Sequence, residues 1–216
     1  MSTPANHHAE YLVSLREAER VLARADPLFR RLIRDHGPCE LAPQWQRSPY
    51  ESLVRSITFQ QLHGKAATAI LARFVALFPG HRFPPPDKVL ARADEDFQGV
   101  GLSRQKLGYI RDVADKAVQG IIPIHRRGLR NADNDELIAR FTQAKGVGRW
   151  SVEMMLIFSL GRLDVLPVDD YGVRAGFSKA KKLQEMIKPK DLAAIGERWA
   201  PYRSVAAWYL WRATEA

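Results

Sequence analysis

A short glycine hairpin in the C-terminal half of the chain has the residue types needed to bind a phosphate. Gly146-Val147-Gly148 separates a helix expected to end near Ala144 from an apolar helix expected to begin at Arg149. The first N–H groups of a helix lack partners within it, and the helix dipole attracts anions to that end. Glycine allows a sugar-phosphate to approach the backbone closely. An isolated G-x-G more often only ends a helix, and Gly99-Val100-Gly101 repeats the pattern.

Two neighbouring carboxylates open the helix that follows. Pro167-Val168-Asp169-Asp170 precedes a helical pattern that extends to Phe177. A carboxylate held in a fixed orientation can stabilise positive charge that develops on a substrate, which makes these two side chains candidate catalytic groups. The stabilisation is larger in a site that excludes bulk water. Either aspartate can instead cap the helix, and capping is compatible with catalysis.

The elements that must position these groups are helical throughout. Apolar spacing and capping signals predict an all-α chain of about ten helices with short loops. Ser48-Pro49-Tyr50-Glu51 is a helix start, and Gly64 suits a helix C-terminal stop, which leaves Gln61 and Leu62 at an apolar turn. Residues 1–9 are expected to form a flexible tail, and residues 10–34 a helix interrupted near Asp26-Pro27. Other expected features are a basic loop over His125-Arg126-Arg127-Gly128-Leu129-Arg130 and a helix capped by Asp133 or Asn134.

Composition narrows the class of protein. The 216 residues carry a formal net charge of +9, which makes a polyanion the first candidate partner. The single cysteine, Cys39, rules out an intrachain disulfide and a cysteine-based cluster or zinc site. No apolar run is long enough to span a bilayer, and Met1 to His8 lacks a signal pattern. We therefore expect an intracellular, cytoplasmic protein.

Several motifs occur together in the order of a known family. They are Gln60-Gln61-Leu62, Val100-Gly101-Leu102-Ser103-x-x-Lys106, Phe141-x-x-x-Lys145-Gly146-Val147-Gly148-Arg149-Trp150, Val168-Asp169-Asp170-Tyr171-Gly172-Val173-Arg174 and Arg198-Trp199-x-Pro201-Tyr202-Arg203-Ser204. This set, between Ser48 and Trp211, resembles the helix-hairpin-helix DNA glycosylase superfamily and within it the 3-methyladenine DNA glycosylase II group. The resemblance implies two helical lobes with a cleft between them, about 48–160 and 10–47 with 161–216. The additional N-terminal α/β domain of a well-known bacterial member is expected to be absent.

The resemblance also implies roles for individual residues. Asp170 is implied as the catalytic carboxylate and Asp169 as a structural neighbour, while Arg174 can pair with Asp170 or with phosphate. Carbonyls of Thr142, Ala144 and Gly146 are candidate ligands of a structural Na, K, Ca or Mg ion, and no cofactor is required. The remaining implied groups are Gly146, Gly148 and Ser151 for phosphate binding, Gln61 and Leu62 for the space left by an extruded base, and Trp150, Met154, Tyr171 and Trp211 for the base pocket.

Trp150 departs from one branch of the family. Bifunctional members carry a lysine immediately after Gly-x-Gly-x, which forms a Schiff base with the sugar and permits strand cleavage. Tryptophan has no nucleophile, so base removal without AP-lyase activity is implied. An aromatic face attracts a positively charged alkylated purine, and Met154, where an aromatic is known in the family, suggests a wider or more adaptable pocket.

The expected protein is a monomeric, monofunctional glycosylase that removes 3-methyladenine or 7-methylguanine from duplex DNA, extruding the base to reach it. Two alternatives remain open at this point: a glycosylase for oxidised or mismatched bases, and a non-catalytic helix-hairpin-helix DNA-binding protein. Locally, Trp150 can be plain core packing and Leu62 can be tucked under a loop. Trp199, Trp208 and Tyr209 are expected in the core.

Overall fold

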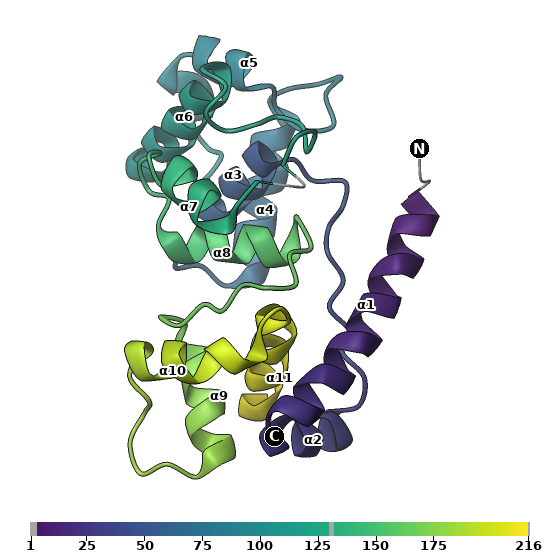
Figure 1. Ribbon diagram of the computed structural model, residues 1–216. Coiled ribbons are helices and arrows are strands. Elements are labelled where there is room, and N and C mark those ends of the chain that lie inside the picture. Colours follow the sequence, from purple (N-terminus) through teal and green to yellow (C-terminus); the bar gives the residue numbers. More distant parts are fainter. Residues whose placement is uncertain (1–3, 130–131, 216) are drawn as a thin grey trace. The chain divides into compact units, whose positions relative to one another are not determined.

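The computed structural model describes residues 4–129 and 132–215 (Figure 1). Within these ranges the regular structure consists of eleven α-helices and two short 3₁₀ helices, without strands. The all-α expectation is confirmed. The chain divides into two compact units, unit 1 with Met1–Pro43 and Gly161–Ala216, and unit 2 with Gln44–Leu160. The sequence analysis placed the first boundary four residues later, between positions 47 and 48.

Unit 2 is built around α3 (Pro49–Phe59), which contacts three other helices of the unit, α4 (Gly64–Ala76), α6 (Arg104–Val118) and α8 (Arg149–Phe158). The remaining elements are α5 (Pro86–Ala91), η1 (Asp94–Phe97) and α7 (Asn134–Phe141), of which α5 packs on α6 and α7 on α8 (Figure 1). The core between these helices contains the fully buried side chains of Leu53, Phe74, Ile110, Leu137, Phe141 and Leu156.

Side-chain caps fix where several of these helices begin. Ser48 Oγ accepts from the Glu51 amide at 3.1 Å, with Pro49 in the first turn, as the sequence predicted. Asp133, rather than Asn134, caps α7. The expectation for Gly64 was wrong, because Gly64 is the first residue of α4. The reversal occurs earlier, where Gln61 adopts a left-handed φ of 56° directly after α3, and a glycine stop is not needed there.

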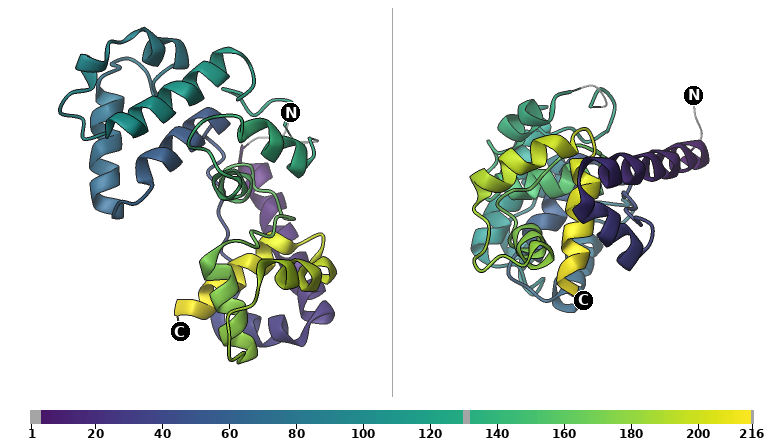
Figure 2. Two further views of the ribbon diagram at one scale, coloured as in Figure 1. Left: turned by 90° about the vertical axis from the view of Figure 1, so that its left-hand side faces the viewer. Right: turned by 60° about the horizontal axis from the view of Figure 1, so that its bottom comes forward.

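Unit 1 is centred on the pair formed by α9 (Tyr171–Lys181) and α11 (Arg203–Glu215), which Figures 1 and 2 show side by side. A Cβ at Gly176 would lie 1.8 Å from the Leu210 carbonyl oxygen, so glycine permits this close packing. α1 (Pro4–Ala25) and α2 (Pro27–His36) contact each other and α11. α10 (Pro189–Gly196) and η2 (Glu197–Trp199) complete the unit. Trp199, Trp208 and Tyr209 are buried, which confirms their place in the core.

The N-terminal expectation was partly right. The interruption after α1 is confirmed, since Asp26 caps α2 through a 3.0 Å bond from the Leu28 amide to its Oδ1 atom. The flexible tail over residues 1–9 is wrong from Pro4 onward, because α1 begins at that residue. Proline is well suited to the first turn of a helix, and the following Ala5, Ala9 and Glu10 are helix formers. Residues 1–3 lie outside the described residues.

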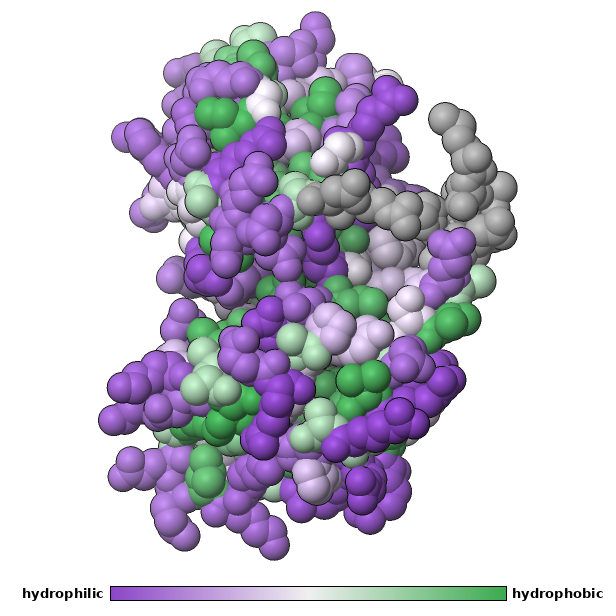
Figure 3. All heavy atoms as spheres, viewed as in Figure 1, coloured by the Kyte–Doolittle hydropathy of each residue, from purple (hydrophilic) through white to green (hydrophobic). Residues whose placement is uncertain are grey.

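One face of each unit can be compared by its hydropathy in Figure 3. On the face in Figure 3, hydrophilic side chains cover most of each unit, and the hydrophobic ones form small groups between them. This distribution agrees with a basic chain in which 26% of residues are charged. Among the described residues, no helix combines the length and apolar character required to cross a membrane.

Candidate functional site

The hairpin between α7 and α8 is held in shape from the side of α6. Gly146 has a φ of 79°, and a Cβ added to it would lie 2.3 Å from the Tyr109 ring. The Lys145 amide donates to Asp112 Oδ2 at 2.8 Å, and the Val147 amide donates to the Ala144 carbonyl at 3.1 Å. Glycine at position 146 is therefore required both by the left-handed backbone and by the tyrosine ring packed against it.

Other amides of the hairpin and of the first turn of α8 are available to a ligand. Gly148 is the N-cap residue of α8, which has no side-chain cap. The N–H groups of Gly146, Gly148, Arg149 and Ser151 donate no hydrogen bond within residues 4–129 and 132–215. The Ser151 side chain is buried. Amides at the positive end of a helix can bind an anion, and here the backbone is the better candidate ligand than the serine hydroxyl.

The turn between α3 and α4 presents an apolar side chain. Leu62 is 40% exposed, and Gln61 beside it is exposed in its left-handed conformation. The alternative in which Leu62 is tucked under a loop does not fit this exposure. Sequence reasoning missed the neighbouring Gln60, whose side-chain amide donates to the Gly146 carbonyl at 3.0 Å. It also gave no role to Lys106, which donates to the Gln60 carbonyl at 2.7 Å.

Asp170 is fixed at the start of α9 in unit 1. Its Oδ1 atom accepts from the Val173 amide at 2.8 Å, which makes it the helix cap, and from Trp211 Nε1 at 2.8 Å. A Cβ at Gly172 would lie 2.8 Å from Trp211 Cδ1, so glycine leaves room for the indole. Asp169 is exposed. Of the two carboxylates, Asp170 is thus the one held in a defined orientation.

The other predicted residues of unit 1 lie on α9 and α11. Tyr171, the first residue of α9, is 73% exposed, and Trp211 is half-buried. The Trp211 indole was expected to line the base pocket, and its bond to Asp170 was not foreseen. Arg174 donates through Nε to the Ile187 carbonyl at 2.8 Å, so this guanidinium is engaged with the backbone within unit 1.

Trp150 and Met154 lie one turn apart on α8 in unit 2. Trp150 is 47% exposed, which is not the environment of a core residue, and Met154 is half-buried. The structure therefore groups the predicted residues by unit. The hairpin, the Leu62 turn, Trp150 and Met154 belong to unit 2, and Asp170, Tyr171 and Trp211 belong to unit 1.

The carbonyls predicted to hold a cation are partly engaged by the chain itself. The Gly146 carbonyl accepts from Gln60, and the Ala144 carbonyl accepts from Val147. Each carbonyl oxygen has two lone pairs, so these two and Thr142 keep the capacity to bind a hard cation. Among the described residues, no group of three or more His, Cys, Asp and Glu side chains could hold a metal ion. A cation at the hairpin stays a prediction.

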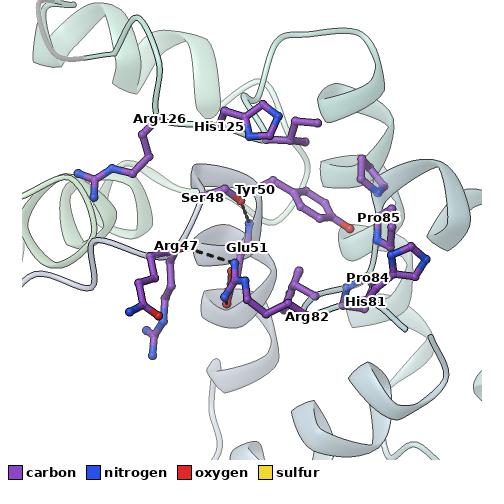
Figure 4. Close-up of a pocket in the computed structure, with 14 residues that line it drawn as sticks. Arg47, Ser48, Tyr50, Glu51, His81, Arg82, Pro84, Pro85, His125 and Arg126 are labelled. Carbon is purple, nitrogen blue, oxygen red and sulfur yellow. Dashed lines mark hydrogen bonds and ion pairs between the residues drawn. The ribbon is translucent and has the colours of Figure 1, made fainter. Parts of the chain in front are cut away.

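A cavity of about 520 Å³ lies at the other end of α3 (Figure 4). The first residues of α3 border it, about 15 Å from the last residue of that 11-residue helix at 1.5 Å per residue. The buried Glu51 carboxylate, which pairs with Arg55 and Arg82, is part of its wall. None of the predicted site residues lines it. Arg126 of the basic loop borders it and donates to the Trp45 carbonyl, while Arg130 of that loop lies outside the described residues.

Known proteins resemble the chain over most of its length. Residues 54–201 match the model of the HhH-GPD superfamily base excision DNA repair protein family. DNA-3-methyladenine glycosylase 1 of Schizosaccharomyces pombe is 36% identical over 216 residues, which cover 100% of this chain and 94% of the relative.

Two solved structures share both the fold and a substantial part of the sequence. The S. pombe 3-methyladenine DNA glycosylase in complex with abasic DNA has a TM-score of 0.79 at 36% identity. The match covers 93% of this chain and 97% of the S. pombe chain. The DNA-3-methyladenine glycosidase of Bacillus halodurans has a TM-score of 0.79 at 37% identity. The match covers 89% of this chain and 86% of the B. halodurans chain.

Proposed function

Because the chain belongs to the HhH-GPD superfamily of base excision DNA repair proteins, we propose that it is a DNA glycosylase that removes alkylated purines from duplex DNA. The observation that carries this proposal is the carboxylate of Asp170, fixed by the first turn of α9 and by the Trp211 indole. The names of similar proteins, which are 3-methyladenine glycosylases, support the substrate class.

In the proposed reaction the bond between the sugar C1′ and the base nitrogen breaks, and the base leaves with the electron pair. Positive charge develops on the sugar, where the Asp170 carboxylate stabilises it, and water then adds to C1′ and loses a proton. An alkylated purine such as 3-methyladenine or 7-methylguanine carries a positive charge and leaves readily. The two hydrogen bonds to Oδ1 keep the carboxylate oriented while this charge forms.

The groups of unit 2 are proposed to bind the DNA around the damaged nucleotide. The amides of Gly146 and Gly148 bind a backbone phosphate, and the exposed Leu62 fills the space that the extruded base leaves in the stack. Gln61 stands beside Leu62. Trp150 and Met154 contact the extruded base, as do Tyr171 and Trp211 of unit 1. The net charge of +9 supports a polyanionic partner.

Base removal is proposed to leave the strand intact. Strand cleavage through a Schiff base requires an amine at the sugar, and Trp150 stands where bifunctional members of the superfamily carry that lysine. The product is then an abasic site in an uncut strand. Incubation without alkali should therefore give no strand breaks, whereas alkali treatment of the same sample should cut at every processed site.

The function is tested by measuring release of methylated purines from a duplex treated with dimethyl sulfate. The wild-type protein should release 3-methyladenine or 7-methylguanine, and Asp170→Asn should lower the rate roughly 10²–10³-fold, the usual effect of losing a principal electrostatic stabiliser. Asp169→Asn is the matched control and should stay within about threefold, because exposed substitutions away from a site have small effects.

The alternatives give other outcomes in the same assay. Release of bases only from duplexes with 8-oxoguanine or a mismatch would identify a glycosylase for oxidised or mismatched bases. Binding of an abasic duplex without any base release, equally strong in Asp170→Asn, would identify a non-catalytic DNA-binding protein. Equal rates for wild type and Asp170→Asn would remove Asp170 from the mechanism.

We further propose that the protein acts as a monomer and that a Na, K, Ca or Mg ion binds the carbonyls of Thr142, Ala144 and Gly146. The acceptor capacity that these carbonyls retain supports the ion. The affinity for an abasic duplex is compared in buffers of equal ionic strength that differ only in the cation. The cation that binds these carbonyls should give the highest affinity. Identical affinities in Na, K, Mg and Ca buffers would contradict it.

A further inference from the structure

The C-terminal end of α3 is capped by a lysine from another helix. The last carbonyls of a helix have no partner within it and lie at the negative end of its dipole. Lys106 of α6 donates from Nζ to the Thr58 carbonyl at 2.9 Å and to the Gln60 carbonyl at 2.7 Å. The ammonium thus satisfies two acceptors at the point where the chain leaves α3 for the turn that carries Leu62. Burial lowers the pKa of Lys106.

The same turn is tied to the phosphate hairpin through Gln60. The Gln60 carbonyl accepts from Lys106, and its side-chain amide donates to the Gly146 carbonyl at 3.0 Å. The backbone of Gln60 is therefore fixed by α6, while its side chain is fixed to the hairpin. Movement of the Leu62 turn away from the hairpin would break the bond to Gly146, and movement away from α6 would break the bond to Lys106.

α6 supports the hairpin directly as well. Tyr109 packs its ring against Gly146, and Asp112 accepts from the Lys145 amide at 2.8 Å. Lys106, Tyr109 and Asp112 follow one another at intervals of three residues, which places neighbouring members on the same side of a helix. One stretch of α6 thus contacts the turn at its start and the hairpin further along.

We propose that α6 sets the distance between the Leu62 turn and the phosphate hairpin, and that Lys106 is the positioning residue that places Leu62 for insertion into DNA. This inference rests on the proposed function, in which Leu62 and the hairpin contact the same duplex. A leucine that enters the stack must stand at a fixed distance from the phosphate that the hairpin binds. A support shared by both elements provides that distance before DNA arrives.

The test begins with Lys106→Met, which keeps the length of the side chain and removes its donors. Base extrusion is followed by the fluorescence of 2-aminopurine next to the lesion, together with single-turnover release of methylated purine. We expect Lys106→Met to lower both the fluorescence change and the release rate at least tenfold. Lys106→Arg should restore much of each. Lys116→Met, the same change further along α6, is the matched control and should behave like wild type.

A double-mutant cycle separates positioning from a general structural effect. If Lys106 acts through Leu62, then Leu62→Ala with Lys106→Met should release base no more than about twofold more slowly than Leu62→Ala alone, since coupled residues are not additive. Multiplied losses would overturn the proposal, as would wild-type extrusion by Lys106→Met. Thermal unfolding of each variant shows whether it is folded.

Gln60→Ala covers the case in which Lys106→Met fails to fold, because it keeps both carbonyls of the α3 cap and removes only the link to the hairpin. It should lower extrusion in the same direction, and unchanged extrusion would contradict the inference. Failure of the proposed function is a separate result. In that event the wild-type protein releases no methylated purine. The role of Lys106 is then decided by comparing base extrusion and affinity for an abasic duplex between wild type and Lys106→Met.

Discussion

At the hairpin of unit 2 the backbone carries the candidate binding groups and side chains hold it in shape, whereas the candidate catalytic group of unit 1 is a side chain, the carboxylate of Asp170. Tyr109, Asp112 and Gln60 support the hairpin, but its candidate phosphate ligands are backbone amides, which only a substitution by proline removes. Asp170 is the proposed catalytic group, and the indole of Trp211 donates a hydrogen bond that orients its carboxylate.

This difference shows what mutation can reveal in each unit. A substitution at the hairpin changes the shape of the backbone, so its effect should be found in DNA affinity and in stability together. A substitution around Asp170 changes the orientation of one carboxylate, so its effect should be found in the rate of base release while DNA binding persists. The predictions below test whether substitutions at the hairpin and around Asp170 differ in this way.

Gly146→Ala should have the largest effect in unit 2. The new methyl group would meet the Tyr109 ring in a backbone with a φ of 79°. A strained left-handed residue costs about 1–3 kcal/mol, and displacement of the amides should lower affinity for an abasic duplex at least about tenfold. Fluorescence anisotropy at fixed salt and thermal unfolding measure the two effects.

Gly148→Ala is the matched control at the same hairpin. A Cβ at Gly148 meets nothing within 4 Å, and its φ of −91° is accessible to any residue. We expect a loss of stability of about 1 kcal/mol or less, from the poorer N-cap alone. Equal stability losses for both alanine variants would show that the packing of Tyr109 does not hold the hairpin.

Trp211→Phe should have a smaller effect, confined to the rate. The variant keeps an aromatic ring and removes the 2.8 Å bond from Nε1 to Asp170. A hydrogen bond to a charged group contributes about 1.5–3 kcal/mol, so we expect single-turnover release to fall roughly ten- to a hundredfold. Affinity for an abasic duplex should change less than about threefold.

Gly172→Ala tests the same orientation from the other side. Its methyl group would meet Trp211 Cδ1, so it should slow release in the same way without removing the indole N–H. Trp208→Phe is the control, because Trp208 lies in the core against Tyr209 and should affect stability alone. If Trp211→Phe lowers DNA affinity as strongly as the rate of base release, then substitutions in the two units do not have different effects, and the comparison made above is wrong.

The sequence predicted those parts of the site that depend on neighbours in the chain. Ser48 and Asp170 are caps whose partners lie three residues away, and local spacing is enough to find such pairs. The turn with Leu62 was predicted between two helices from the start at Ser48 and a stop expected at Gly64, and the turn is present although Gly64 begins α4. The all-α fold followed from apolar spacing and capping signals, which are also read from neighbours in the chain.

The hydrogen bonds that fix the candidate site residues could not be predicted from the sequence in this way. Gln60 and Gly146 are separated by 86 positions in the sequence. The separation is 46 positions for Lys106 and Gln60, and 41 positions for Asp170 and Trp211. Two of these bonds end on a backbone carbonyl, which every residue has, so residue types give no signal. Gly64 misled for a related reason, since a left-handed Gln61 took the role that glycine usually fills.

The smallest predicted effect compares how the two units hold their buried carboxylates. In unit 1, Asp26 is 1% exposed and pairs with Lys181 at 3.2 Å and Arg198 at 3.4 Å. Burial raises its pKa, but the Leu28 amide and these two cations outweigh it, so the pKa lies below its ordinary value of 3.8. The charged form therefore stabilises unit 1 above that pH, and the contribution is lost as the pH falls below it.

Asp26→Asn keeps a capping side chain and removes the charge. We expect it to lower the free energy of unfolding by about 1–2 kcal/mol at pH 7, with the difference from wild type shrinking as the pH falls below 4. Denaturant unfolding between pH 7 and pH 3 measures this. In unit 2, Glu51→Gln serves as the comparison, because its carboxylate pairs with Arg55 and Arg82 beside a cavity. A stability difference for Asp26→Asn that does not change with pH would show that the cap, and not the charge, stabilises this corner of unit 1.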